Sequence, residues 1–168
     1  MNVLTTSICA VLLSCTTAAA LEPMSATITV SGGNLYDYVV IGEHAAATDS
    51  YDNAYDTISP GNLNADMGQP FICVIVPQPA WKPALSKLRG DVRSLAKKQE
   101  WPLSVTSTFA KGTPLQVALR TEQSRLSPAM ALTLKVGDKM YDLKAGPLTI
   151  PAPGPGNASG LLVSAEQP

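Results

Sequence analysis

The sequence contains one histidine, His44, and only three cysteines. A hydrolytic triad needs a histidine that an acid orients, and no glycine-rich phosphate loop, paired-cysteine motif or nucleophile elbow is present. Carboxylates that are distant in the sequence can still meet in a fold and hydrolyse a glycosidic bond. Nothing in the sequence points to such a pair, so we expect that the protein is not an enzyme.

Charge is also scarce. Lys and Arg number 12 against 13 Asp and Glu, so the net charge of −1 argues against a nucleic-acid-binding protein. Apolar residues make up 45% of the 168 positions, enough for one domain with an ordinary core. Aromatics are only 5%, whereas Gly (12) and Pro (14) together are plentiful, which favours strands joined by loops.

The first twenty residues have the features of a secretion signal, except that no Lys or Arg precedes the apolar segment at 3–13. This segment is shorter than the roughly 20 apolar residues that span a bilayer, although a retained anchor is the alternative. We therefore predict a signal peptide at 1–20, a single domain at 21–168 without a membrane span, and an extracellular, cell-surface or periplasmic location. Cleavage would leave Cys73 as the only cysteine, and its apolar neighbours predict a small buried side chain rather than a reactive thiol.

Strand-like patterns recur along the domain. They cover residues 26–30, 35–41, 71–76, 101–107, 115–120, 131–136, 139–144 and 161–165. The uninterrupted apolar run at 71–76 predicts a central strand covered on both faces, and Trp101, Leu103 and Val105 alternate with polar residues as in a half-buried strand. Together these segments predict an all-β fold, a two-layer antiparallel immunoglobulin-like sandwich of about 7–9 strands.

A tight hairpin is predicted around Gly137-Asp138. A two-residue turn there places Leu134 opposite Tyr141 and Leu132 opposite Leu143 on the inner face, with Thr133 opposite Asp142 and Lys135 opposite Met140 on the outer face.

Two segments are less clearly defined. Apolar residues within 82–99 fall at helical spacing, which predicts a short helix near 83–98, but Gly90 interrupts the pattern and residues 91–94 are equally consistent with a short edge strand. The Pro/Gly-rich segment 147–156 predicts an extended loop before the last strand, after which residues 166–168 are expected to fray.

The basic residues are concentrated in the middle of the chain. Six of them lie within 82–98, whereas every charged residue before position 70 is acidic. Lys87, Arg89 and Arg93 are therefore candidates for a partner-binding patch. The alternative is two solvated faces that attract one another weakly.

The loop at 47–62 combines Asp49, Asp52 and Asp56 with Tyr51 and Tyr55. The three aspartates are candidate calcium ligands, although their spacing differs from that of an EF-hand loop. In the structural interpretation, which we favour, the carboxylates accept backbone N–H bonds in Asx-type turns and the tyrosines cover an edge of the sheet or the end of the core.

The order of these features resembles the immunoglobulin-like and fibronectin-type-III-like modules of secreted bacterial proteins. The resemblance rests on residues 36–42 leading into 47–52, on 91–94, on the strand that Trp101 opens, and on the hairpin at Gly137-Asp138; Ser50 stands where such modules are expected to carry glycine. It implies a non-catalytic extracellular module used for attachment or assembly, and it does not identify a partner.

Three functional hypotheses follow. The first is a structural or binding subunit of an extracellular assembly that contacts a protein partner or other copies of itself through strand edges. The second is a calcium- or carbohydrate-binding module that uses Tyr36, Tyr38, Tyr51, Tyr55 and the loop aspartates. The third is a hydrolase with dispersed carboxylates.

Overall fold

The computed structural model describes residues 20–168. Residues 1–19, all but the last residue of the predicted signal peptide, lie outside the described part. None of the helices in residues 20–168 has the length and apolar character needed to cross a bilayer.

The described residues form an all-β fold with one four-residue α-helix. The strands are β1 (Met24–Gly32), β2 (Leu35–Glu43), β3 (Thr57–Ile58), β4 (Ile72–Pro77), β5 (Lys87–Arg93), β6 (Lys98–Ser107), β7 (Pro114–Leu119), β8 (Ala131–Val136), β9 (Lys139–Asp142), β10 (Leu148–Pro151) and β11 (Ala158–Glu166). The helix is α1 (Leu63–Asp66), and three 3₁₀ turns are η1 (Pro83–Leu85), η2 (Thr121–Gln123) and η3 (Leu143–Ala145). Each of the eight predicted strand segments overlaps one of these strands.

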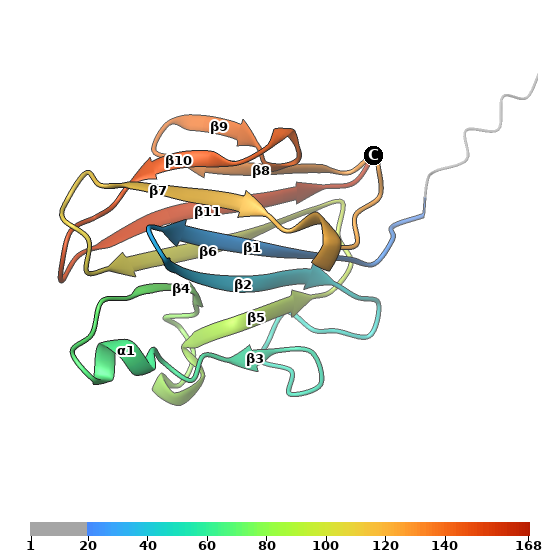
Figure 1. Ribbon diagram of the computed structural model, residues 1–168. Helices are drawn as coiled ribbons and strands as arrows, with labels where there is room; N and C mark the ends of the chain where they lie inside the picture. The colour runs from blue at the N-terminus through green and yellow to red at the C-terminus, as the bar shows by residue number, and fades with distance from the viewer. Residues whose placement is uncertain (1–19) are drawn as a thin grey trace, which may run out of the picture.

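The strands form a single mixed sheet, so the predicted two-layer antiparallel sandwich is wrong. The order is β10-β7-β1-β2-β5-β4-β6-β11-β8-β9, with β3 attached to β5, and β2 and β5 are parallel. Because β4 pairs with both β5 and β6, it joins the halves that would otherwise be separate layers. The sheet curls until its two ends, β10 and β9, approach each other, which gives a nearly closed, barrel-like shape (Figure 1).

The sheet divides at β5. β3 lies along one edge of β5, opposite Leu88 and Gly90. The other edge is shared, since β4 is opposite Leu88 and β2 is opposite Gly90 and the residues that follow. Arg89 therefore lies at the point on this edge where the strand beside β5 changes from β4 to β2. The guanidinium of Arg89 pairs with Asp37 of β2, and the second carboxylate oxygen of Asp37 accepts the N–H of Val74 in β4 at 2.9 Å. The ion pair therefore links β2, β4 and β5 at this branch point, which we call the fork.

The segment at 82–99, for which the sequence allowed a helix, contains only the turn η1 before it becomes β5 and then β6. β5 lies inside the sheet rather than at its edge. Gly90 helps to explain why this segment is a strand inside the sheet and not a helix, because a Cβ at position 90 would lie 3.3 Å from the Cβ of Thr57 in β3. The glycine lets β3 approach β5, and a helix would have lost that pairing.

The interior is filled by the inward faces of the strands. Trp101, Leu103 and Val105 of β6 are buried, as their alternation predicted. β4 also alternates, which corrects the expectation that both of its faces are covered: Ile72, Val74 and Val76 face the core. Cys73 on the outer face is only partly buried, rather than fully buried as predicted.

The β8–β9 hairpin confirms the predicted register. Leu134 is opposite Tyr141, Thr133 is opposite Asp142, and Lys135 is opposite Met140. Gly137 occupies the turn with φ of 59°, a conformation that glycine adopts without a steric penalty. The expected pairing of Leu132 with Leu143 is absent from the ladder because β9 ends at Asp142 and η3 begins.

The C-terminal part of the chain is more ordered than predicted. The segment at 147–156 contains β10, which pairs with β7, instead of being an extended loop throughout. Gln167 does not fray: its side chain is buried, accepts the N–H of Glu22 at 2.7 Å and donates to the carbonyl of Glu22 at 3.0 Å. The start and the end of the described chain are thereby held together.

Candidate functional site

The aspartates of the loop at 47–62 accept hydrogen bonds from backbone N–H groups. Asp49 accepts the N–H and the hydroxyl of Ser94 at 3.1 and 2.7 Å. Asp56 accepts N–H bonds from Asp52 at 2.8 Å and from Val92 at 3.0 Å, and Asp52 accepts one from the N–H of Ala54 at 3.0 Å. The expected acceptance of backbone N–H bonds is thus seen for all three carboxylates, and the bond between Asp52 and Ala54 is the Asx turn expected in the structural interpretation.

The three aspartates are not brought together as a calcium site. Among residues 20–168, no group of three His, Cys, Asp or Glu side chains is arranged to hold a metal ion. Asp56 is buried beside the β5 backbone, and this burial raises the pKa of its carboxyl despite the two N–H bonds that it accepts. The loop geometry is thus explained by its internal hydrogen bonds.

The two candidate tyrosines of the loop pack on neighbouring aromatic residues. Tyr55 stacks on His44 with ring centroids 4.8 Å apart, and Tyr51 meets the ring of Trp81 edge-on at 6.1 Å. The Tyr51 hydroxyl lies 3.1 Å from the side-chain oxygen of Asn53. Tyr51 and Trp81 are partly buried against the core, whereas Tyr55 packs on His44.

The three candidate basic residues do not form one patch. The guanidinium of Arg89 is held by Asp37 and by the carbonyl of Tyr38, the latter at 2.7 Å. Arg93 pairs with the buried Asp91 at 2.9 Å, and Lys87 lines a separate hollow. The two arginines thus neutralise buried carboxylates.

An exposed aromatic surface lies on the outer face of β1 and β2. Along β2, Asp37 and Val39 point inward, while Tyr36 and Tyr38 point outward and are 63% and 42% exposed. Between them and the start of η2 is a hollow of about 220 Å³, lined by Thr27, Tyr36, Tyr38, Val40, Arg120 and Gln123. We call this surface the tyrosine groove.

Each ring of the tyrosine groove carries a guanidinium. Arg120 lies 5.7 Å from the centroid of Tyr36, and Arg89 lies 5.3 Å from the centroid of Tyr38. Arg120 is itself positioned by a 3.1 Å hydrogen bond from its Nε to the hydroxyl of Thr29. Cation–π contacts of this kind are worth about 0.5–1 kcal/mol at exposed sites, so each contact favours the observed position of its ring before any ligand binds.

A second, separate hollow lies further along the same strands. Thr27 pairs with Val40, and the next outward pair along the ladder is Ser25 with Gly42. A hollow of about 220 Å³ lies near this pair and is lined by Pro23, Met24, Ser25, Glu43, His44, Tyr55, Val92 and Arg125. Gly42 itself is covered, because a Cβ there would lie 2.9 Å from the carbonyl oxygen of Met24.

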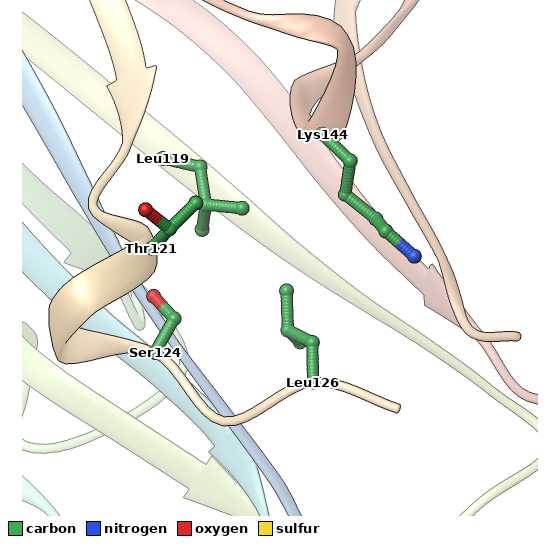
Figure 2. Close-up of a pocket in the computed structure, with 5 residues that line it drawn as sticks. All are labelled: Leu119, Thr121, Ser124, Leu126 and Lys144. Carbon is green, nitrogen blue, oxygen red and sulfur yellow. The ribbon is translucent and has the colours of Figure 1, made fainter. Parts of the chain in front are cut away.

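A further hollow, of about 280 Å³, lies where the two ends of the sheet approach each other. Leu119 and Leu126 contribute aliphatic side chains, and Thr121, Ser124 and Lys144 complete the lining (Figure 2). The amine of Lys144 donates to the carbonyls of Pro128 and Met130, both at 2.8 Å. The ammonium group of Lys144 is therefore already hydrogen-bonded, and this hollow offers a ligand mainly apolar contact.

Part of the tyrosine groove was accessible from the sequence. Tyr36 and Tyr38 were candidates, and the alternation in β2 is the signal that turns them outward. Arg120 and Gln123 were missed, because they reach the groove only through the pairing of β1 with β7, between residues about ninety positions apart. Comparisons with models of protein families, with curated proteins and with solved structures give no match to this chain.

Proposed function

We propose that the chain is a non-catalytic binding domain that recognises a protein partner through the tyrosine groove. The observation that carries this proposal is the pair of outward tyrosines, Tyr36 and Tyr38, each with a guanidinium over its ring. Tyr and Arg are the residues most enriched at the energetic centres of protein interfaces. Rings that are already fixed lose little conformational freedom on binding, which favours affinity.

The charges around the groove also suit a protein surface. Arg89 is neutralised by Asp37, and Arg120 lies 3.7 Å from Glu122. The groove therefore presents flat aromatic area with hydrogen-bond donors and little net charge. Such a surface differs from the strongly basic groove expected of a nucleic-acid binder.

A site-specific crosslink tests this proposal. The purified chain, with a photoreactive phenylalanine derivative in place of Tyr36, is incubated with the extracellular fraction of the source and irradiated. A matched control carries the same group in place of Met140, a 58% exposed residue on β9, the last strand in the order of the sheet. We expect a discrete protein adduct from position 36 and none from position 140.

Affinity for the crosslinked partner provides the quantitative readout. Tyr36→Ala combined with Tyr38→Ala should weaken binding by at least about 30-fold, the equivalent of a 2 kcal/mol interface centre. Met140→Ala should leave the affinity unchanged. Equal adducts at both positions, or unchanged affinity of the double variant, would refute the proposal.

A glycan is the second candidate ligand. Tyr36 and Tyr38 are two residues apart on one strand, about 7 Å, and the Gln123 side chain lines the hollow without a hydrogen-bond partner among residues 20–168. Stacking on one ring with an amide at its side is suited to a sugar. Thermal unfolding in the presence of soluble glycans decides the matter, because a ligand that binds only the folded state raises its stability.

The proposed setting is outside the cytoplasm, which rests on the leader-like features of residues 1–20. Peptide sequencing of the protein recovered from the extracellular fraction should then begin at Leu21. Recovery of the intact N-terminus from the cell interior would contradict this part of the proposal.

A further inference from the structure

Apolar side chains protrude from the segment between β3 and β4. Leu63, at the start of α1, is 71% exposed, and Met67, four residues later, is 57% exposed. Ile58 of β3 is also exposed nearby in the sequence. Residues four apart on a helical turn lie on the same side, so Leu63 and Met67 form an apolar knob.

The knob is held rigidly. The side-chain oxygen of Asn62 accepts N–H bonds from Asn64 at 3.1 Å and from Ala65 at 3.3 Å, and so caps α1. The amide nitrogen of Asn62 donates to the carbonyl of Ile72 at 2.9 Å, which ties α1 to β4. These bonds hold the backbone that carries two large exposed apolar side chains, and exposed apolar patches are typical of interaction surfaces.

A hollow of about 310 Å³ lies beside the knob, between α1 and the outer face of β4 and β6. Phe71, Cys73 and Ile75 supply its apolar lining. Cys73 and Ile75 are the outward residues of β4 and are only partly buried. A protruding apolar group and an apolar recess therefore occur side by side on one face.

The same hollow carries one charge of each sign. Asp66 is the last residue of α1, Lys87 is the first residue of β5, and both line the hollow. Within residues 20–168, neither side chain takes part in a salt bridge or a side-chain hydrogen bond. A two-fold axis places the same patch on both partners, so a patch with a knob, a recess and two opposite charges complements itself.

We propose that this face is a two-fold interface between two copies of the chain, in which the Leu63–Met67 knob of each copy fills the hollow of the other. Asp66 of each copy then faces Lys87 of its partner. This proposal is independent of the proposed function, because the tyrosine groove lies on the outer face of β1 and β2. A dimer would carry two grooves and gain avidity for a repetitive partner.

Light scattering of the purified chain over a range of concentrations tests the proposal. We expect a mass twice that of one chain, with dissociation on dilution. Leu63→Asp with Met67→Asp should halve the mass, and the fold should be retained because both side chains are exposed. Met140→Asp, on the far side of the molecule, is the control and should remain a dimer.

Charge reversal separates a self-complementary interface from any other contact. Lys87→Glu alone brings two acids together and should weaken the dimer by at least tenfold. Adding Asp66→Lys to the same chain restores opposite charges across the axis and should recover at least half of the lost affinity in free-energy terms. A double variant as weak as the single variant would refute the two-fold arrangement.

Cys73 reports whether the hollow is covered. Its alkylation, followed by mass spectrometry of the peptide that contains it, should be several-fold slower in the concentrated dimer than in the Leu63→Asp, Met67→Asp variant. A chain that is monomeric at all concentrations, a dimer that survives the knob variant, or alkylation rates that are equal would each overturn the proposal. The first of these outcomes leaves the tyrosine groove untouched, so the two proposals fail separately.

Discussion

Replacing Asp37 with alanine should destabilise the fold more than any single surface change. Asp37 and Arg89 lie at the fork between β2, β4 and β5, with side chains only 11% and 15% exposed. Asp37→Ala leaves the guanidinium without its counter-charge, which costs about 3–5 kcal/mol when one partner of a buried pair is removed. It also leaves the Val74 N–H without its acceptor, a further cost of about 1–3 kcal/mol.

The expected loss is a large part of the total stability, which for a domain is about 5–15 kcal/mol. Urea unfolding followed by tryptophan fluorescence measures it, because Trp101 is buried in the core. Asp37→Asn is the matched control, since its amide oxygen can still accept the N–H of Val74. We expect this variant to lose less than Asp37→Ala by roughly the cost of the missing hydrogen bond.

A double-mutant cycle isolates the pair itself. Arg89→Met keeps most of the aliphatic length, and the combination of Asp37→Ala with Arg89→Met removes both charges. The double variant should be less destabilised than the sum of the single variants by at least about 2 kcal/mol, because neither charge is left unpaired. Additive single effects, or a loss below about 1 kcal/mol for Asp37→Ala, would refute the assignment of this ion pair as the closure of the fork.

Two further predictions concern β2 and β5. Burial raises the pKa of Glu43 above its ordinary value of 4.5, so between the ordinary and the raised value the folded state holds more protons than the unfolded state, and stability falls as pH rises through that window. Glu43→Gln should therefore gain stability relative to the natural chain as pH rises above 4.5 and through the raised pKa of Glu43. Urea unfolding at several pH values measures this gain, and a pH-independent difference would contradict this cause. Gly90→Val should displace β3, because a Cβ at position 90 would lie 3.3 Å from Thr57. We expect the free energy of unfolding to fall by about 1–3 kcal/mol in thermal unfolding and proteolysis within 47–62 to become faster. Unchanged proteolysis would exclude the displacement.

The strands themselves were predictable because each is a local pattern. The alternation of Trp101, Leu103 and Val105, and the glycine at position 137, are properties of a few neighbouring residues. β3 was missed because two residues form no recognisable period. The position of β5 within the sheet depends on its pairing with Val40, which no pattern within 82–99 contains.

The arrangement of the strands was predicted wrongly for a related reason. A sandwich and a curled sheet use the same alternation of inward and outward residues. What distinguishes them here is that β4 hydrogen-bonds to a strand on each side. Whether the strands form a sandwich or one curled sheet therefore depends on which strands pair across the chain, and composition does not predict this pairing.

The candidate site shows the same division. The Asx turn of Asp52 forms between residues close in sequence, as the structural interpretation predicts, whereas Asp49 and Asp56 also accept bonds from the distant residues Ser94 and Val92. Lys87, Arg89 and Arg93 are also close in sequence, yet they reach a surface hollow, Asp37 and Asp91 respectively. The three side chains therefore have different partners, so the clustering of these basic residues in the sequence did not predict a common patch.

The parallel pairing of β2 with β5 has a consequence for the order in which the molecule assembles. Antiparallel neighbours such as β1 and β2 are joined by a tight turn and can zip together at once. β2 cannot complete its other edge until the chain has closed a loop from Val40 to Gly90, and a loop of this length is entropically costly before its contacts form. Folding dominated by such distant pairings takes milliseconds to seconds. During that interval the unpaired edge of β2 is the part of the nascent protein most exposed to wrong strand partners.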